Sequence, residues 1–134
     1  MARFQAVYYR ASNGSEPVDA FIEGLHDPVR QTALDLQIDR LNMLSPTNPH
    51  LPFPHSSQVD GELRELRCHF GREHYRILYR RSGNLLVLLH MFRKNSGRLP
   101  GPEVEIARQR WHDFKARMDG GSRVPPRAAG HDAP

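Results

Sequence analysis

The residues that could do chemistry gather in one stretch of the chain, residues 61–98, where arginines interleave with aliphatic side chains. Its first two expected strands carry Arg64, Arg67, Arg72, Arg76, Arg80 and Arg81, and the third runs into Arg93, Lys94 and Arg98. Side chains alternate between the two faces of a strand, so the pattern predicts a sheet with one packed face and one cationic face. A face of guanidinium groups is suited to hold a phosphate backbone.

The reaction that such a surface could catalyse is the cleavage of RNA without a metal ion. The 2′-OH of the RNA is then the nucleophile, and arginine or lysine stabilises the negative charge that gathers on the phosphoryl oxygens. Arg67 and Arg76 would reach one phosphate together if their strands are antiparallel neighbours. His90 and Lys94 are candidates for proton transfer, with Glu65 as a further possibility.

These residues also have structural interpretations that the sequence leaves open. Arg76 could be a cross-strand partner of Glu65 and nothing more, and His90 could simply end its strand. His50 and His55 could be ligands or catalytic groups, or surface histidines of a loop. Neither a phosphate-binding glycine loop nor another sequence-local catalytic motif is present to decide between these interpretations.

Composition and charge narrow the class of protein. A length of 134 residues favours one domain. No apolar run is long enough to span a membrane, no secretory signal opens the chain, and a single cysteine, Cys68, fits a reducing cytoplasm. Residues 11–60 hold two basic and seven acidic residues, whereas residues 61–118 hold thirteen basic and six acidic ones. Such segregation attracts polyanions, so we expect a cytoplasmic nucleic-acid-binding protein with no metal, no cofactor and no membrane partner.

The elements that position these residues follow from periodicity and from glycine and proline. A first strand is expected at about residues 3–10. Two helices with apolar stripes should follow, one from Pro17 and one from Pro28, the second capped by Asp27 and stopped at Ser45. Four prolines make residues 45–60 an extended loop. The last helix should run from Pro102 to Gly120.

Three strands are expected between the loop and the last helix, at residues 62–70, 73–80 and 85–92. The third is apolar on both faces, at residues 85–89, so it should be central in the sheet and covered on both sides. Residues 119–134 are rich in Gly, Pro and Ala without apolar periodicity and are interpreted as a disordered tail. The folded domain is therefore expected at residues 1–118.

Over residues 3–118 the sequence is similar to the phage Gp49-like/HigB branch of the RelE toxin superfamily. The matching segments occur in the order of that family, namely Val7–Tyr9, Pro17–Phe21, Leu63–Arg67, Tyr75–Tyr79, Leu88–Lys94 and Pro102–Ala107. The resemblance implies a RelE-like α+β fold. In it, an N-terminal strand and a helical hairpin pack on an antiparallel-dominated four-stranded sheet, and a C-terminal helix follows.

The resemblance also implies a function. Members of this branch are toxins of type II toxin-antitoxin systems, mRNA interferases that cleave mRNA on the ribosome and are blocked by an antitoxin with a helix-turn-helix domain. It implies that Arg76, Arg67, and Arg93 or Lys94 contact the scissile phosphate. With the residues considered above, we expect catalysis by Arg67, Arg76, His90 and Lys94, and RNA binding by Arg64, Arg80, Arg93 and Arg98. Two alternatives share the fold. One is a ParE-like gyrase inhibitor, against which the basic cluster argues. The other is a catalytically inactive nucleic-acid-binding or co-repressor protein.

Overall fold

A computed structural model describes residues 3–95, 101–121 and 125–131. Its elements, in chain order, are β1 (Gln5–Tyr8), α1 (Pro17–Glu23), α2 (Pro28–Ile38), the 3₁₀ helix η1 (Leu41–Met43), β2 (Ser56–Asp60), β3 (Leu63–Phe70), β4 (Glu73–Ser82), β5 (Leu85–Lys94) and α3 (Gly101–Asp119). None of the described helices is long and apolar enough to cross a membrane.

The strands form one sheet in the order β1-β5-β4-β3-β2, in which only the β1–β5 pair is parallel. This architecture confirms the predicted α+β class, and β5 is a central strand, as its apolar sequence indicated. Within the described part of the chain, the sheet has five strands rather than the expected four. The additional strand, β2, was assigned to the proline-rich loop. The last proline of that loop is Pro54, however, so the following backbone N–H groups can pair with β3.

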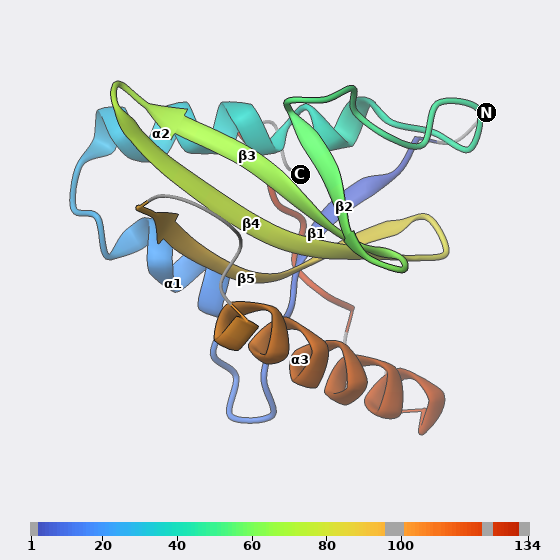
Figure 1. Cartoon of the computed structure of the whole chain (residues 1–134). Coiled ribbons are helices and arrows are strands. Elements are labelled where there is room, and N and C mark those ends of the chain that lie inside the picture. Colours follow the sequence, from blue (N-terminus) through green and yellow to red (C-terminus); the bar gives the residue numbers. More distant parts are fainter. Residues whose placement is uncertain (1–2, 96–100, 122–124, 132–134) are drawn as a thin grey trace.

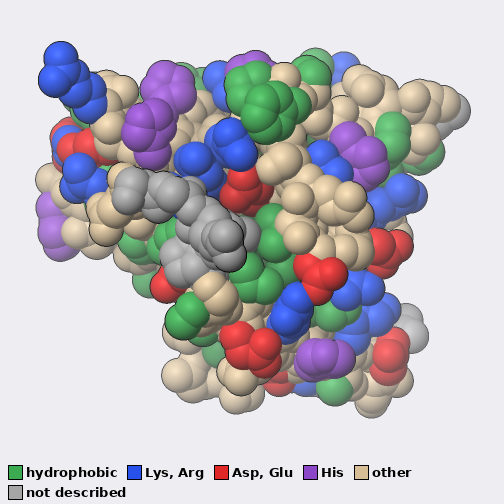
Figure 2. Space-filling view, viewed as in Figure 1, with side chains coloured by type: hydrophobic (Ala, Val, Ile, Leu, Met, Phe, Trp, Pro, Cys, Tyr) green, Lys and Arg blue, Asp and Glu red, His purple; other side chains and the backbone are tan. Residues whose placement is uncertain are grey.

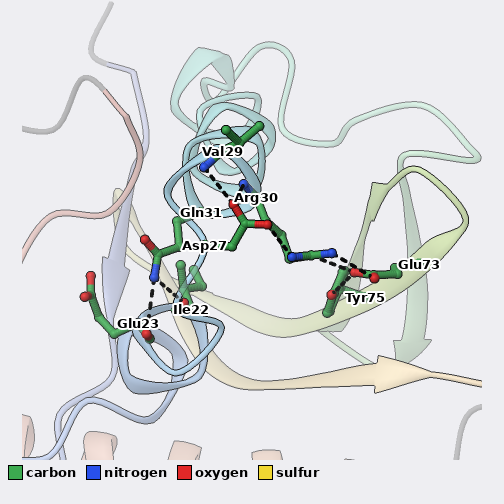
Figure 3. A network of polar contacts seen from close by, with 8 residues as sticks. All are labelled: Ile22, Glu23, Asp27, Val29, Arg30, Gln31, Glu73 and Tyr75. Carbon is green, nitrogen blue, oxygen red and sulfur yellow. Dashed lines mark hydrogen bonds and ion pairs between the residues drawn. The ribbon is translucent and has the colours of Figure 1, made fainter.

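The helical hairpin of α1 and α2 covers one face of the sheet, and α3 covers part of the other (Figure 1). Both hairpin helices begin at their prolines, and the Asp27 carboxylate accepts hydrogen bonds from the N–H groups of Val29 and Arg30 at 3.1 and 3.4 Å. The Arg30 guanidinium also binds Asp27 and Glu73 and so ties the hairpin to the start of β4 (Figure 3).

The second helix ends at Ile38, six residues before the end that the periodicity predicted. The chain tightens there into η1, and the Asn42 side-chain oxygen accepts a hydrogen bond of 2.7 Å from the N–H of Ala6 in β1. The side-chain amide of Asn42 donates to the carbonyl of Ala129 at 3.0 Å. The early end of α2 thus lets one side chain fasten both the first strand and the C-terminal segment.

The sequence predicted a disordered tail, but residues 125–131 form defined contacts with the rest of the fold. They lie along the outer edge of β1, where Ala129 donates to the carbonyl of Ala6 at 2.8 Å and Tyr8 donates to the carbonyl of Arg127 at 2.9 Å. Ala129 is buried, and Arg127 pairs with Glu16 and Asp19. An edge strand offers unpaired backbone groups, and composition alone did not reveal that this segment would satisfy them. The domain boundary at residue 118 stays a prediction.

Candidate functional site

The candidate site lies on the face of the sheet that carries α3, beyond the part that the helix covers. The register places Arg67 of β3 directly opposite Arg76 of β4, and Arg76 directly opposite Phe92 of β5. The two arginines are therefore cross-strand neighbours on one face, where opposite side chains have Cβ atoms about 4.5–5.5 Å apart. Figure 2 shows basic side chains beside acidic ones over this part of the sheet.

Lys94 joins this face because β5 contains a bulge. The register shifts so that Leu78 of β4 pairs with His90 whereas Tyr79 pairs with Leu88, which leaves Leu89 as an additional residue. Side-chain alternation is interrupted there, and Lys94 falls on the α3 face while Arg93 falls on the hairpin face. Without the bulge the two residues would exchange faces.

A groove of about 640 Å³ runs from this cluster to the first turns of α3. Its lining includes Ser57 and Asp60 of β2, Glu65 and Arg67 of β3, and Lys94 of β5. Arg108 of α3 lines it too and forms an ion pair with Asp60. The groove is open to solvent, and the described part of its charged lining has three cations against two carboxylates.

One buried carboxylate organises the two arginines. Glu65 is 5% exposed and accepts hydrogen bonds of 2.9 Å from Nε of Arg67 and from Oγ of Ser57. Its other oxygen lies 3.7 Å from Nε of Arg76, a distance too long for a hydrogen bond. The predicted pair of Arg76 and Glu65 therefore exists, but it engages one side of Arg76 only weakly.

Arg76 is the more desolvated of the two arginines. Its side chain is 11% exposed against 35% for Arg67, and its buried Nε has no hydrogen-bond partner among the described residues. Burial lowers the pKa of Arg76, and the nearby Arg67 charge lowers it further, while Glu65 acts in the opposite direction. A partly desolvated guanidinium gains much from an anion close to it on this face of the sheet.

Two histidines that the sequence analysis did not consider form the next row of the same face. His69 of β3 is opposite His74 of β4, and His74 is opposite Lys94 of β5. Both imidazoles are exposed, and each lies two residues along its strand from Arg67 or Arg76. Figure 2 shows histidine side chains beside basic ones on this face. The signal that could have found them is the two-residue spacing, which puts them on the face of the arginines.

An exposed aromatic ring lies at the rim of the cluster. Phe53, in the proline-rich loop, is 71% exposed, and its ring centroid is 4.9 Å from the guanidinium carbon of Arg67. Stacking on the ring orients the guanidinium and leaves much of the ring accessible to another flat group.

His90 is placed away from the groove, beneath α3. Its Nε2 lies 2.5 Å from a carboxylate oxygen of Glu103, and its Nδ1 lies 3.0 Å from Nη1 of Arg110. An arginine nitrogen can only donate, so Nδ1 must be the unprotonated acceptor and the ring is neutral, with its proton on Nε2. Burial lowers the pKa of His90 in the same sense, although Glu103 opposes it. Both ring nitrogens are thus engaged with α3.

The structure does not bring together the four residues expected to bind RNA. Arg64 lies on the hairpin face, where its Nε donates to Ser56 at 3.3 Å, and Arg93 is exposed on that same face. Arg80 is on the α3 face, but its guanidinium carbon lies 4.4 Å from the centroid of the Trp111 ring, and it pairs with Glu62. Arg98 lies outside the described residues.

Comparison with known proteins identifies the family of the chain. The family model described as phage derived protein Gp49-like (DUF891) matches residues 21–112, which contain α2, the whole of β2–β5 and the groove. A search of curated proteins finds no match to the chain.

Proposed function

Because the chain belongs to the Gp49-like family, whose members are of the RelE/HigB toxin-like type, we propose that it is an endoribonuclease toxin of a type II toxin-antitoxin system. The observation that carries the proposal is the placement of Arg67, Arg76 and Lys94 on one face of the sheet, where Arg67 and Lys94 line the groove. Its substrate is mRNA on the ribosome in the cytoplasm, and its partner is a helix-turn-helix antitoxin.

The proposed reaction uses the arginines as electrostatic catalysts. The 2′-oxygen of a ribose attacks the adjacent phosphorus, a 2′,3′-cyclic phosphate forms, and the bond to the 5′-oxygen breaks. The negative charge on the non-bridging oxygens rises in the transition state, where the Arg76 and Arg67 guanidinium groups and the Lys94 ammonium group stabilise it. The Glu65 carboxylate holds Arg67 in place, while Arg76, whose Nε is buried beside Glu65, acts through its positive charge.

The residues proposed for proton transfer are the two exposed histidines next to the arginines, His69 and His74. The 2′-OH must lose a proton and the leaving 5′-oxygen must gain one, and imidazole is the side chain best matched to both steps near neutral pH. His74 lies between His69 and Lys94 and next to the arginine row, whereas both nitrogens of His90 are engaged with α3. We therefore assign proton transfer to His74, with His69 beside it, and give His90 the task of positioning α3.

Phe53 supplies the proposed base contact. Proteins that bind single-stranded RNA stack unpaired bases on exposed aromatic rings next to a cationic groove. Phe53 meets that description because it is largely exposed and already in contact with Arg67. A base next to the scissile phosphate would stack there.

One observation favours a second function, RNA binding without cleavage. Glu65 neutralises part of the charge of Arg67 and Arg76, so the two guanidinium groups and one carboxylate leave a single net positive charge at the centre of the site. Such a balance suits a protein that holds RNA, for example as a co-repressor with its antitoxin. In that case the protein would bind mRNA and leave it intact.

The experiment that separates the two functions is the expression of wild type, Arg76→Ala and Arg80→Ala in a coupled translation system, with mapping of mRNA ends. Arg80 lies on the same strand and face as Arg76 but stacks on Trp111, so it is the matched control. We expect cleavage within codons by wild type and Arg80→Ala and a loss of about 10²–10³-fold in Arg76→Ala. Intact mRNA with all three proteins would support the binding function, and equal cleavage by all three would remove Arg76 from the site.

A further inference from the structure

A second pocket lies on the opposite face of the sheet from the groove. It has a volume of about 470 Å³ and is formed where the β2–β3 turn and the β4–β5 hairpin meet the proline-rich loop. Figure 1 shows the turn and the hairpin together at one end of the sheet. The pocket is lined by His50 of the loop, Arg64 of β3 and Arg81 of β4, with Tyr79 and Leu86 at its apolar side.

The basic groups of this pocket have donors to offer. Arg64 uses its Nε to donate to Ser56, and Arg81 uses its Nε to donate to the carbonyl of Gly83 at 2.7 Å. Among the described residues, no hydrogen bond or ion pair engages the terminal Nη atoms of either arginine. Stacking of Arg81 on the Phe4 ring, at 4.3 Å, further fixes the orientation of its guanidinium. Two oriented guanidinium groups with unused donors form an anion site.

His50 is close enough to both arginines to respond to them. Burial lowers the pKa of His50, and the charges of Arg64 and Arg81 lower it further, while the backbone of Pro49 acts in the opposite direction. Among the described residues of the lining, the only carboxylate is that of Glu62, whose side chain is 76% exposed and pairs with Arg80. The pocket therefore has an excess of positive charge, and an anion in it would favour protonation of His50.

A structural link joins the pocket to the catalytic groove. Gln58 of β2 lines both, and β2 is the edge strand that separates them. A single-stranded chain that leaves the groove over this edge would enter the pocket next.

We propose that the pocket of His50, Arg64 and Arg81 is a phosphate-binding site that holds a phosphate of the RNA chain other than the one cleaved. The binding of a phosphate group does not depend on the proposed function, but its assignment to the RNA chain rests on that function. A free mononucleotide carries the same chemistry and is the other source that the experiment must separate.

The test uses two probes on the full chain. Adenosine 5′-monophosphate reports binding of a phosphate group, and a short 2′-O-methyl oligoribonucleotide, which lacks the nucleophile and cannot be cleaved, reports binding of an RNA chain. We expect both probes to shift the imidazole resonances of His50 in NMR spectra and to raise its pKa, and the Arg64→Gln/Arg81→Gln variant to lose both effects.

The oligonucleotide gives a second readout, its affinity by fluorescence anisotropy. The double variant should bind about tenfold more weakly, and the slope of log affinity against log salt should become shallower by about 0.7 for the phosphate contact that is lost. Arg10→Gln is the control, because Arg10 is exposed and its side chain has no hydrogen bond or ion pair among the described residues. It removes a charge without removing a contact and should leave the slope unchanged.

The outcomes are distinct. If a folded protein shows no shift of His50 with either probe, the phosphate site is refuted. If adenosine 5′-monophosphate binds but the affinity and salt slope for the oligonucleotide are unchanged in the double variant, the pocket binds free nucleotides and its assignment to RNA is refuted. Failure of the nuclease function appears separately, as intact mRNA in the translation assay, and leaves these binding results unaffected. Should the double variant not fold, Arg64→Gln alone answers the same questions.

Discussion

Replacement of Glu65 by glutamine tests how the buried carboxylate controls the site. The amide oxygen of glutamine can still accept from Ser57, so the change removes mainly the negative charge between Arg67 and Arg76. These two guanidinium groups, opposite each other on adjacent strands, would then face one another without a counter-charge. We expect the fold to become less stable and the groove to become more attractive to RNA.

The magnitude follows from the contacts. The 2.9 Å hydrogen bond from Arg67 to Glu65 is charge-assisted, and such bonds contribute about 1.5–3 kcal/mol to stability. The Arg76 contact at 3.7 Å is longer and adds less, but its loss leaves that arginine buried without a counter-charge. Together they predict a decrease of about 2–4 kcal/mol in the free energy of unfolding.

RNA affinity should change in the opposite direction. The summed charge of Arg67, Arg76 and residue 65 rises by one in Glu65→Gln. The phosphate of a bound RNA chain then supplies the negative charge that the carboxylate supplied. We expect Glu65→Gln to bind the uncleavable oligonucleotide several-fold more tightly at low salt, and inorganic phosphate to raise its melting temperature more than that of wild type. Cleavage should nevertheless slow, because Arg67 loses the partner that orients it.

The assays are urea unfolding followed by circular dichroism and anisotropy with the oligonucleotide. For the unfolding assay the matched control is Glu62→Gln, because Glu62 is 76% exposed and pairs with Arg80, and its loss should cost less than about 1 kcal/mol. It does not serve as a control for RNA binding, because Glu62 lines the proposed phosphate pocket. A folded Glu65→Gln protein with wild-type stability, or with weaker RNA binding, would refute the view that Glu65 restrains an RNA-binding pair of arginines.

Three further predictions concern the surroundings of the groove. Phe53→Ala should weaken binding of the oligonucleotide by about 1–3 kcal/mol in anisotropy while Phe53→Tyr retains it, and equal affinities would exclude base stacking there. His90 is held neutral in the fold with a lowered pKa, so as pH decreases the unfolded state takes up the His90 proton before the folded state does, and the free energy of unfolding should fall below about pH 6.5. Urea titrations of His90→Gln should show a weaker pH dependence of stability. A pH dependence equal to that of wild type would contradict this assignment. Deletion of residues 125–134 should expose the N–H of Tyr8 to hydrogen exchange but not that of Tyr9, which donates to Leu88; protection of both would mean that the segment does not cover β1.

Much of the fold could be predicted because local signals agreed with the final packing. Pro17 and Pro28 begin the hairpin helices, and the apolar residues of β5 contribute to both cores, with Leu88 on the hairpin side and Leu89 on the α3 side. Alternation along β3 and β4 correctly placed Arg67 and Arg76 on one face. These signals lie within single elements, where spacing alone determines which side a residue faces.

What could not be predicted depends on contacts between distant segments. The strand β2 exists because β3 supplies its hydrogen-bond partners, and the C-terminal segment is ordered because β1 leaves an edge open. The bulge at Leu89 determines which face Lys94 occupies, but no glycine or proline in β5 indicates its position in the sequence. His90 was a candidate for proton transfer, but Glu103 and Arg110, distant in sequence, occupy both of its nitrogens.

The bulge in β5 also bears on how this site could tolerate insertions and deletions. Loss of one residue between the bulge and Arg93 would shift the end of the strand by one position against β4, which exchanges the faces of the residues that follow and normally destroys a site. Here the two residues that would change places, Arg93 and Lys94, are both cations. The groove would receive a guanidinium group instead of an ammonium group and keep its charge, so consecutive basic residues make the third cation robust to a slip in register.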